Sequence, residues 1–511
     1  MVLDPAMCYQ AVLSRDPRFD GRFFTGVLTT GIYCRPVCPA RTPRLENVRF
    51  FACSAAAEDA GFRPCRRCRP ETAPGTPAWT GTCATIARSL RLIAEGALDR
   101  SGVDEMAERL GVGARHLRRL FAERLGASPL AIARTRRVHF ARRLIDETDL
   151  PIADIAFASG FRSLRRFNTA IREAFGGPPT ALRARHGLRM ERRGRDPRHD
   201  SGNRSAPRRR ELSLRLPFRP PFDWDSILAF FACRAIPGVE EVVDRAYRRT
   251  IETGGRAGTI EIRCAPGGGA LLLQLGTPPS DDLLRVVERA RRLFDLDADP
   301  LPIAAHLAKD PLLGAAVAAR PGLRVPGAWD PFEIAIRAVL GQQVSVAGAR
   351  TLAGRLVRAH GETLPAASGA LTHVFPTPRA LACGDLTSIG LPRARAGALR
   401  TLATAFRDRP DLLDGAPGLD DALLRLQEIP GIGPWTAGYI AMRGMGEPDA
   451  LPSGDLGLRR ALRGGSVREI ESRAEAWRPW RAYATIHVWH PDFAVAREPR
   501  ETANRSRRRK R

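Results

Sequence analysis

Residues 426–444 read LQEIPGIGPWTAGYIAMRG, and this stretch decides the architecture of the second half of the chain. An apolar helix leads into the tight turn PGIG, and a second helix begins at Pro434, which is typical of a helix-hairpin-helix. Gly431 and Gly433 let the backbone approach a DNA phosphate, where amide groups can donate without reading sequence. By itself this motif indicates DNA binding more reliably than catalysis.

Downstream, residues 451–462 (LPSGDLGLRRAL) place Asp455 beside glycines and before an apolar helix. A lone Asp at such a position can simply be the N-cap of the helix. Together the hairpin and this Asp resemble the helix-hairpin-helix DNA glycosylase superfamily, and the similarity to its AlkA-type 3-methyladenine members runs from about residue 212 to 489. Supporting segments are PPFDWDSILAFFACRA at 220–235, the stretch 319–349, and WRPWRAYATIHVW at 477–489.

The resemblance implies that Asp455 is the catalytic carboxylate and that Trp435, Tyr439 and Trp489 line a pocket for a flipped base. Aromatic walls stack an electron-poor base and favour a cationic alkylated purine. A carboxylate can stabilise the oxocarbenium-like sugar or orient the attacking water. Trp435 and Tyr439 lie one helical turn apart, so both can face one cavity. The alternative for this aromatic pair is an ordinary core patch.

The residue types around the hairpin narrow the chemistry. Bifunctional superfamily members carry a lysine where this chain has Trp435, and lysine occurs here only at Lys309 and Lys510, so we expect a monofunctional glycosylase. The last cysteine is Cys383, so no iron–sulfur cluster is expected.

Gln343 aligns with the leucine that AlkA-type enzymes wedge into the vacated base stack, and a polar wedge fills that gap less well.

Two cysteine pairs stand near the amino terminus: Cys34 and Cys38 in GIYCRPVC, and Cys65 and Cys68 in FRPCRRC. Four thiolates at this spacing predict one tetrahedral zinc site, for which a purely structural zinc knot is the commoner use. The other six cysteines show no partner spacing and are expected to be ordinary buried thiols.

The same segment resembles the amino-terminal domain of Ada-type adaptive-response regulators through residues 29–38, 44–50 and 60–70. In that family the first cysteine, here Cys34, accepts a methyl group from a methylated DNA phosphate, while the other three remain zinc ligands. Zinc keeps the sulfur deprotonated, and the thiolate is the nucleophile for displacement at a methyl carbon. Methylation would change the formal charge from about −2 to about −1 and so weaken repulsion from DNA. A single-use acceptor is expected, because the thioether has no evident route back.

An internal repeat follows: AERLGV at 107–112 is echoed by AFASGF at 156–161. Each copy precedes an Arg-rich amphipathic helix, which predicts two helix-turn-helix units, the alternative being two helical hairpins with solvated arginine faces. The segment resembles the AraC-type DNA-binding domain, which implies an activator that reads promoter DNA. The expected DNA contacts are Arg115, His116, Arg118, Arg119, Arg162 and Arg165.

Composition and pattern divide the chain into six segments within a multidomain, mainly α architecture. These are a small α/β zinc methyl-acceptor domain (1–77), an all-α double helix-turn-helix domain (78–186), a flexible Arg-rich linker (187–211), a small α+β domain with an antiparallel sheet (212–300), an all-α helix-hairpin-helix glycosylase domain (301–492), and a basic disordered tail (493–511).

The charge balance, 81 Lys+Arg against 55 Asp+Glu for a net +26, favours a polyanionic partner. We expect a cytoplasmic monomer without membrane contact, because neither a signal pattern nor an apolar run of membrane-spanning length is present. Its expected partners are double-stranded DNA with alkylated bases and methylated phosphates, promoter DNA and RNA polymerase. The expected function is hydrolytic excision of alkylated purines joined to methylation-controlled transcription. A regulatory alternative makes the glycosylase half a passive DNA clamp.

Overall fold

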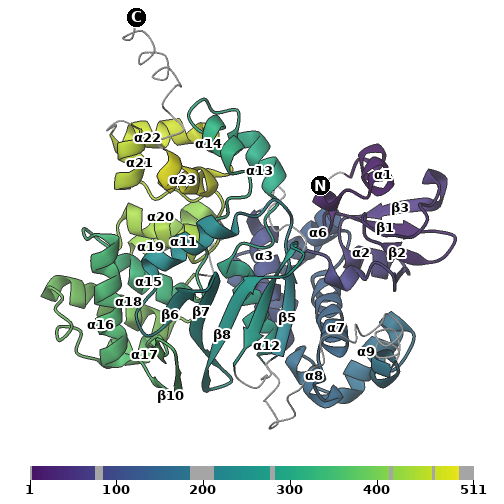
Figure 1. Ribbon diagram of the computed structural model, residues 1–511, viewed down its shortest axis with the longest axis horizontal. Helices are drawn as coiled ribbons and strands as arrows, with labels where there is room; N and C mark the ends of the chain where they lie inside the picture. The colour runs from purple at the N-terminus through teal and green to yellow at the C-terminus, as the bar shows by residue number, and fades with distance from the viewer. Residues whose placement is uncertain are drawn as a thin grey trace, which may run out of the picture.

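A computed structural model describes residues 3–74, 84–184, 212–276, 282–413, 418–462 and 466–493 (Figure 1). The predicted linker 187–211, residues 494–511 of the predicted tail, and the predicted boundary between the zinc domain and the double helix-turn-helix domain, called the reader below, lie outside these ranges. The first residue of the predicted tail, Phe493, is described and is buried. Within them the chain is mainly helical with small sheets, as the sequence predicts. No helix in the described ranges combines the length and apolarity that a bilayer crossing requires.

The amino-terminal unit is a small α/β domain built on a four-stranded sheet in the order β3-β1-β2-β4. β1 pairs with its two neighbours antiparallel, whereas β2 and β4 run parallel. The α1 helix begins where the Asp4 side chain accepts from the Ala6 amide, and it ends at Arg15 in the left-handed conformation. The elements are α1 (Pro5–Ser14), β1 (Phe24–Val27), β2 (Ile32–Cys34), β3 (Val48–Phe51), α2 (Ser54–Asp59) and β4 (Arg63–Pro64).

The next unit is all helical and contains the two predicted helix-turn-helix pairs, α5–α6 and α8–α9, joined by the long helix α7. Leu117 and Phe121 of α6 and Phe167 and Ile171 of α9 are fully buried, so each recognition helix turns one apolar face inward. The helices are α3 (Ala84–Ala94), α4 (Ala97–Arg100), α5 (Val103–Arg109), α6 (Ala114–Leu125), α7 (Pro129–Glu147), α8 (Ile152–Ala158) and α9 (Leu164–Phe175).

A five-stranded antiparallel sheet in the order β5-β9-β8-β7-β6 follows. Its strands β8 and β9 form a hairpin, in which Ile262 pairs with Leu273 and both side chains are buried. The elements are β5 (Leu212–Pro217), α11 (Trp224–Arg234), β6 (Glu240–Val243), β7 (Ala246–Thr253), β8 (Arg256–Cys264), β9 (Ala270–Leu275) and α12 (Leu283–Leu293).

The carboxy-terminal region is a helical assembly around α15, which is apolar and buried almost along its whole length. One two-stranded ribbon, β10–β11, interrupts the helices. The elements are α13 (Pro300–Leu307), α14 (Gly314–Ala319), α15 (Pro331–Leu340), α16 (Val346–His360), β10 (Thr363–Ser368), β11 (Leu371–His373), α17 (Pro378–Cys383), α18 (Arg393–Asp408), α19 (Leu419–Gln427), α20 (Pro434–Arg443), α21 (Leu456–Ala461), α22 (Val467–Ala474) and α23 (Arg481–Trp489).

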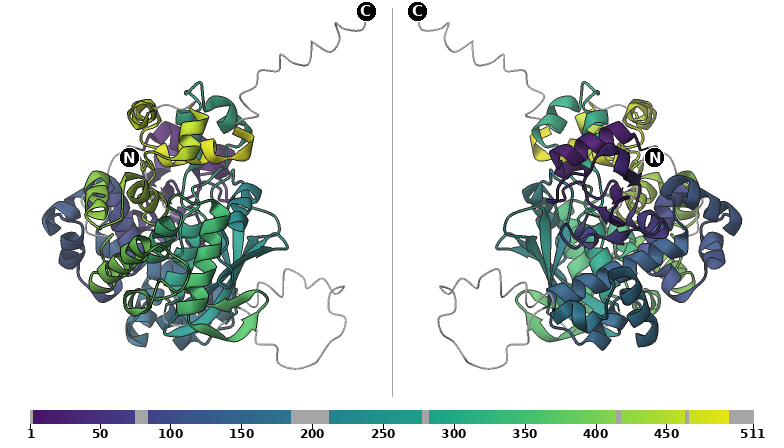
Figure 2. Two further views of the ribbon diagram at one scale, coloured as in Figure 1. Left: turned by 90° about the vertical axis from the view of Figure 1, so that its left-hand side faces the viewer. Right: turned by 90° about the vertical axis from the view of Figure 1, so that its right-hand side faces the viewer.

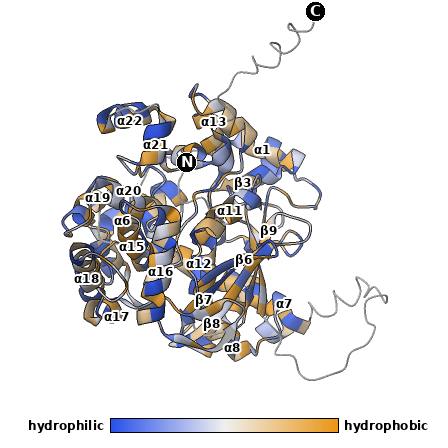
Figure 3. Cartoon of the chain, turned by 60° about the vertical axis from the view of Figure 1, so that its left-hand side comes forward, coloured by the Kyte–Doolittle hydropathy of each residue, from blue (hydrophilic) through white to orange (hydrophobic). Residues whose placement is uncertain are grey.

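The reader packs directly against the five-stranded sheet. Leu144 of α7, Phe167 of α9 and Leu214 of β5 belong to one cluster of buried apolar side chains. Figure 3 draws α7 and α8 beside this sheet, and Figure 2 shows the purple-to-blue segments on one side of the molecule and the green helices on the other. The two halves therefore share a packed interface in addition to the covalent connection.

Candidate metal centre and base pocket

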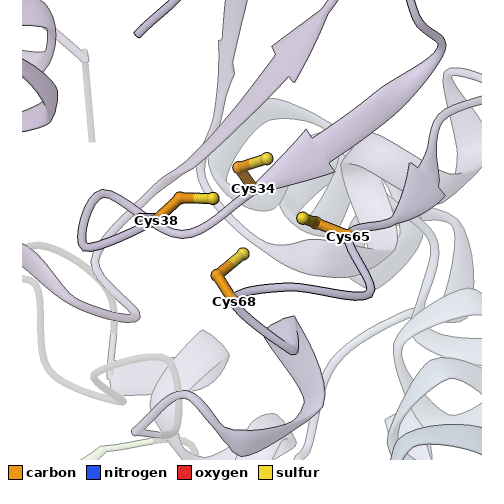
Figure 4. A group of neighbouring side chains, drawn as sticks. All are labelled: Cys34, Cys38, Cys65 and Cys68. Carbon is orange, nitrogen blue, oxygen red and sulfur yellow. The ribbon is translucent and has the colours of Figure 1, made fainter. Parts of the chain in front are cut away.

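Four cysteine sulfurs meet at one end of the small sheet and surround a common centre (Figure 4). Cys34 ends β2 and Cys65 directly follows β4, while Cys38 and Cys68 lie in the loops beyond them. All four Sγ atoms lie within 4.8 Å of one another. Zinc–sulfur bonds of about 2.3 Å place tetrahedral thiolates about 3.8 Å apart, so this set fits one zinc ion.

Backbone amides distinguish the four sulfurs. The Arg35 N–H donates to Cys68 Sγ and the Arg67 N–H donates to Cys65 Sγ, with both N···S distances 3.4 Å. Cys34 and Cys38 are half-buried, whereas Cys65 and Cys68 are buried. Access therefore favours Cys34 and Cys38 over the other two sulfurs as nucleophiles.

A cavity of 490 Å³ opens beside Cys34. The end of α9 closes one side of this cavity through Ala174 and Phe175, and the Arg66 guanidinium donates to the Phe175 carbonyl at 3.3 Å. The cationic lining suits a DNA backbone, whose phosphates carry negative charge. The arginines that line the cavity are Arg35, Arg41, Arg63, Arg66 and Arg67. These arginines were not predicted from the sequence, although all of them lie close to the cysteines in the chain.

The remaining cysteines differ in exposure. Burial raises the pKa of Cys8 and of Cys53 to about 11, so these thiols stay protonated near neutral pH. Cys233, Cys264 and Cys383 are exposed. The expectation that they are buried was wrong, because each lies at the surface end of its helix or strand. Cys83 lies outside the described residues.

The six side chains predicted to touch DNA are all exposed. Four of them project from α6, on the side opposite the buried Leu117, while Arg162 precedes α9 and Arg165 lies in its first turn. Arg118 pairs with Asp104 at 3.2 Å, and Arg119 contacts the His116 ring at 3.1 Å. The structure thus places the predicted contacts in two groups, one on each recognition helix.

Asp455 is the N-cap of α21, because its Oδ1 atom accepts from the Leu458 amide at 2.9 Å. The same carboxylate also receives two indole donors. Trp489 Nε1–H donates to Oδ1 at 2.8 Å, and Trp435 Nε1–H donates to Oδ2 at 3.2 Å. Asp455 therefore caps α21 and also contacts aromatic side chains of the candidate pocket. Three donors from separate elements fix the direction of the carboxylate.

The three predicted base-pocket aromatics form a continuous stack next to Asp455. The Trp435 and Tyr439 rings lie 5.4 Å apart at 21°, and the Tyr439 and Trp489 rings lie 6.2 Å apart at 38°. All three rings are partly buried, and Tyr439 and Trp489 also pack against the carboxy-terminal core. At Gly457 a Cβ atom would lie 3.0 Å from the Trp489 ring and 2.9 Å from Asp455 Oδ1, so a side chain there would crowd the site.

Arg443 holds the Tyr439 ring of this stack, and this role was not predicted from the sequence. Its guanidinium donates to Tyr439 Oη at 2.5 Å and to the carbonyls of Pro326 and Gly327 at 2.8 and 3.0 Å. Burial would raise the pKa of Tyr439, but the positive charges of Arg443 and Arg234 hold it below its usual value. The spacing of four residues from Tyr439 was the available signal.

The hairpin and the loop before α16 are joined by Gln342, which sequence analysis also missed. Its side-chain amide donates to the Gly431 carbonyl at 2.8 Å and to Thr436 Oγ1 at 3.0 Å. Gln343 follows with a φ of 57° and an exposed side chain. At Gly431, φ is 90°, and at the exposed Gly433 no described side chain caps the start of α20. The first amides of α20 are therefore open to a phosphate.

Models of three known protein families match successive parts of the chain. The chain matches the metal binding domain of Ada over residues 7–71, a helix-turn-helix domain over 106–185, and the AlkA N-terminal domain over 213–330. The probable bifunctional transcriptional activator/DNA repair enzyme AlkA of Mycobacterium tuberculosis is 46% identical over 486 residues, covering 94% of this chain and 95% of that protein. The chain belongs to this family.

Relatives of each half agree with membership in the bifunctional AlkA family. DNA-3-methyladenine glycosylase 2 of Escherichia coli is 36% identical over 280 residues, which are 54% of this chain and 96% of that enzyme. The bifunctional activator and repair enzyme Ada of Escherichia coli is 35% identical over 179 residues, which are 35% of this chain and 48% of that protein. The predicted fusion of an Ada-type half with an AlkA-type half is confirmed, and the four cysteines form its zinc site.

Proposed function

We propose that this protein excises alkylated purines, of the 3-methyladenine type, from DNA and reports methylated DNA through its regulatory half. The observation that carries the proposal is the Asp455 carboxylate, held by the indoles of Trp435 and Trp489 beside the Tyr439 ring. The site follows a helix-hairpin-helix whose two glycines, Gly431 and Gly433, are exposed, so a duplex bound there would lie close to the pocket.

The chemistry follows from these residue types. An alkylated purine is cationic and needs little protonation to leave, so the pocket has mainly to bind the flipped base and stabilise the sugar. The aromatic stack attracts the cationic base through its π faces. As the glycosidic bond breaks, its electron pair leaves with the purine, and Asp455 stabilises the positive sugar and orients the water that adds to it. Trp435 occupies the position of the lysine in bifunctional members, so the reaction ends with base release.

In the zinc domain, Cys34, Cys38, Cys65 and Cys68 would hold the ion, which keeps the sulfurs deprotonated at neutral pH. The arginine-lined cavity binds the DNA backbone next to Cys34. Cys34 Sγ attacks the methyl carbon of a phosphotriester. The new S–C bond forms as the C–O bond breaks, and the phosphodiester leaves with its negative charge. The product at Cys34 is a thioether, so each molecule accepts one methyl group.

The division of labour follows the predicted segments. Residues 1–77 accept the methyl group, 78–186 read promoter DNA through their exposed arginines, and 212–300 with 301–492 form the glycosylase. DNA is the partner of both halves. We further propose that the protein acts as a cytoplasmic monomer and that the promoter-bound form contacts RNA polymerase.

A base-release assay tests the enzymatic proposal. Duplex DNA methylated at purines is incubated with wild type or with Asp455→Asn, which removes the charge and keeps the shape. We expect wild type to release 3-methyladenine, and the variant to lose at least about a hundredfold in rate while still binding DNA. Equal release by both proteins would defeat the role of Asp455. The absence of release by folded, DNA-bound wild type would favour the passive-clamp alternative.

A further inference from the structure

The helix that carries two of the pocket aromatics ends against the regulatory half. α20 bears Trp435 in its first turn and Tyr439 at its middle, and it ends at Arg443, after which the chain turns to Glu447. The ten residues of this helix span about 15 Å, so Glu447 lies beyond the end of the helix that is opposite Trp435. A contact at that end can shift both aromatic rings, because a helix moves as a rigid element.

Glu447 makes that contact through a buried ion pair. Arg88 Nε lies 2.8 Å from the Glu447 carboxylate, and Arg91 approaches it to 3.7 Å. The side chains of Arg88 and Glu447 are 3% and 2% exposed. Both arginines belong to α3 of the reader. Because a buried carboxylate without a partner is strongly unfavourable, Glu447 ties the end of α20 to α3.

A second connection reaches the same place through Arg443. This residue holds Tyr439 and also grips the Gly327 carbonyl. The Gly327 amide donates to the Leu293 carbonyl at the end of α12, at 3.0 Å. Arg292, adjacent in α12, forms an ion pair with Glu95 of the reader. The end of α20 at which Arg443 holds Tyr439 is thus linked to the reader by two routes, one through Glu447 and one through Gly327 and α12.

The junction between the end of α20 and the reader is incompletely filled by side chains. A cavity of 330 Å³ lies between α3, α7, α12 and the turn that contains Glu447. On its other side the end of α20 packs into the carboxy-terminal core through the buried Ala441, Met442 and Met445. Toward the reader this cavity leaves less apolar packing, so the ion pair is a direct contact between the end of α20 and α3. Other charged pairs cross the same boundary away from α20, including Arg136–Glu288 at 3.2 Å and Arg22–Asp299 at 2.9 Å.

We infer that Arg88 is a positioning residue of the base pocket: through Glu447 it fixes α20, and with it Tyr439 and Trp435, relative to Asp455. The inference rests on the proposed glycosylase function. It makes the DNA reader a structural part of the active site, so a change in docking between the halves changes the rate of base release.

The test uses the full chain and a matched pair of substitutions. Glu447→Gln removes the carboxylate charge at the end of α20, and Glu288→Gln removes one from the same interface on α12. The single-turnover rate constant for 3-methyladenine release is measured at saturating protein, together with DNA affinity and melting temperature. We expect Glu447→Gln and Arg88→Gln to slow release about tenfold, because small displacements of positioned groups are costly, and Glu288→Gln to stay within about twofold.

A merely structural role would lower the melting temperature and leave the rate constant of the folded protein unchanged, and that result would overturn the inference. Equal slowing by Glu288→Gln would overturn it as well. Should Glu447→Gln and Arg88→Gln fail to fold, Arg91→Gln weakens the same contact from a less buried position. A slowing of about threefold then supports the inference, and a wild-type rate defeats it. If wild type itself releases no base, the proposed function fails first, and this inference falls with it.

Discussion

The cysteine site and the proposed base pocket are both assigned chemistry on methylated DNA, but they are built in opposite ways. The four cysteines come from residues 34–68 and meet on one small sheet, where they can hold one zinc ion. The pocket draws Asp455, Tyr439 and Trp489 from three separate elements, and hydrogen bonds and ring contacts hold it together. The first site depends mainly on its own ligands. The second depends on how distant helices pack.

This difference explains what supports each site. A metal centre tolerates a small scaffold, because the metal–ligand bonds themselves supply folding energy. The pocket has no such bond and needs an outer layer of support, which here includes Arg443, Gln342 and the pair of Glu447 with Arg88. Changes far from the pocket are therefore expected to reach it more readily than they reach the cysteine site.

The largest expected contrast comes from removing the metal. A strong zinc chelator should abolish methyl transfer to the protein, because the thiolates become protonated thiols, while base release should change by less than about twofold. Both activities are followed in one sample, methylation by intact mass and release by chromatography of free bases. Cys34→Ala should lose methyl acceptance alone, and Cys53→Ala should keep it. Loss of both activities on chelation would show that the base pocket also depends on the metal.

A tenfold or larger effect is expected from the indoles that hold Asp455. Trp489→Phe and Trp435→Phe each keep an aromatic ring and remove one donor to the carboxylate. Hydrogen bonds to charged groups contribute about 1.5–3 kcal/mol, so base release should slow about tenfold to a hundredfold. Trp480→Phe is the control, because that buried ring has no contact with Asp455 in the described residues. Single-turnover release that is equal in all three variants would contradict the role of the indoles.

A smaller effect is expected at the loop that meets the hairpin. Gln342→Ala removes hydrogen bonds to the Gly431 carbonyl and Thr436. Each neutral hydrogen bond contributes about 1 kcal/mol, so kcat/KM for a lesion duplex should fall about fivefold to thirtyfold. Gln343→Leu should instead raise kcat/KM, since an apolar wedge fills the vacated stack better. A rise with Gln342→Ala, or a fall with Gln343→Leu in folded protein, would show that this loop acts otherwise.

The smallest effect concerns the contact between the zinc domain and α7. Burial opposes the charge of His139, but the Glu58 carboxylate 2.9 Å away raises the pKa of the ring above its usual 6.5. The resulting stability is fully present below about pH 6.5 and is lost as the pH rises through the raised value. The melting temperature of wild type should therefore exceed that of His139→Gln more at pH 6 than at pH 8.5. An equal difference at both pH values would exclude a charged His139.

Much of both sites could be predicted from the sequence because residue type and spacing state the chemistry directly. Two closely spaced cysteine pairs predict a zinc ligand set without knowledge of the rest of the fold. PGIG followed by Pro434 predicts the start of a helix, and α20 begins at that residue. The exposure of Cys233, Cys264 and Cys383 was not predictable in this way. A single thiol carries no pattern, and burial depends on neighbours that are far away in the chain.

By itself, the sequence determined the order of the domains, the zinc ligands, the two helix-turn-helix units and the residue types of the proposed base pocket. These are encoded locally, in periodicity, turns and spacing. Only the tertiary structure decided that Asp455 accepts from two indoles, that Arg443 supports Tyr439, and that Glu447 is buried against Arg88, 359 residues away along the chain. Such pairs form because burial forces charges and donors from distant segments to satisfy one another, and no local pattern records which partner they find.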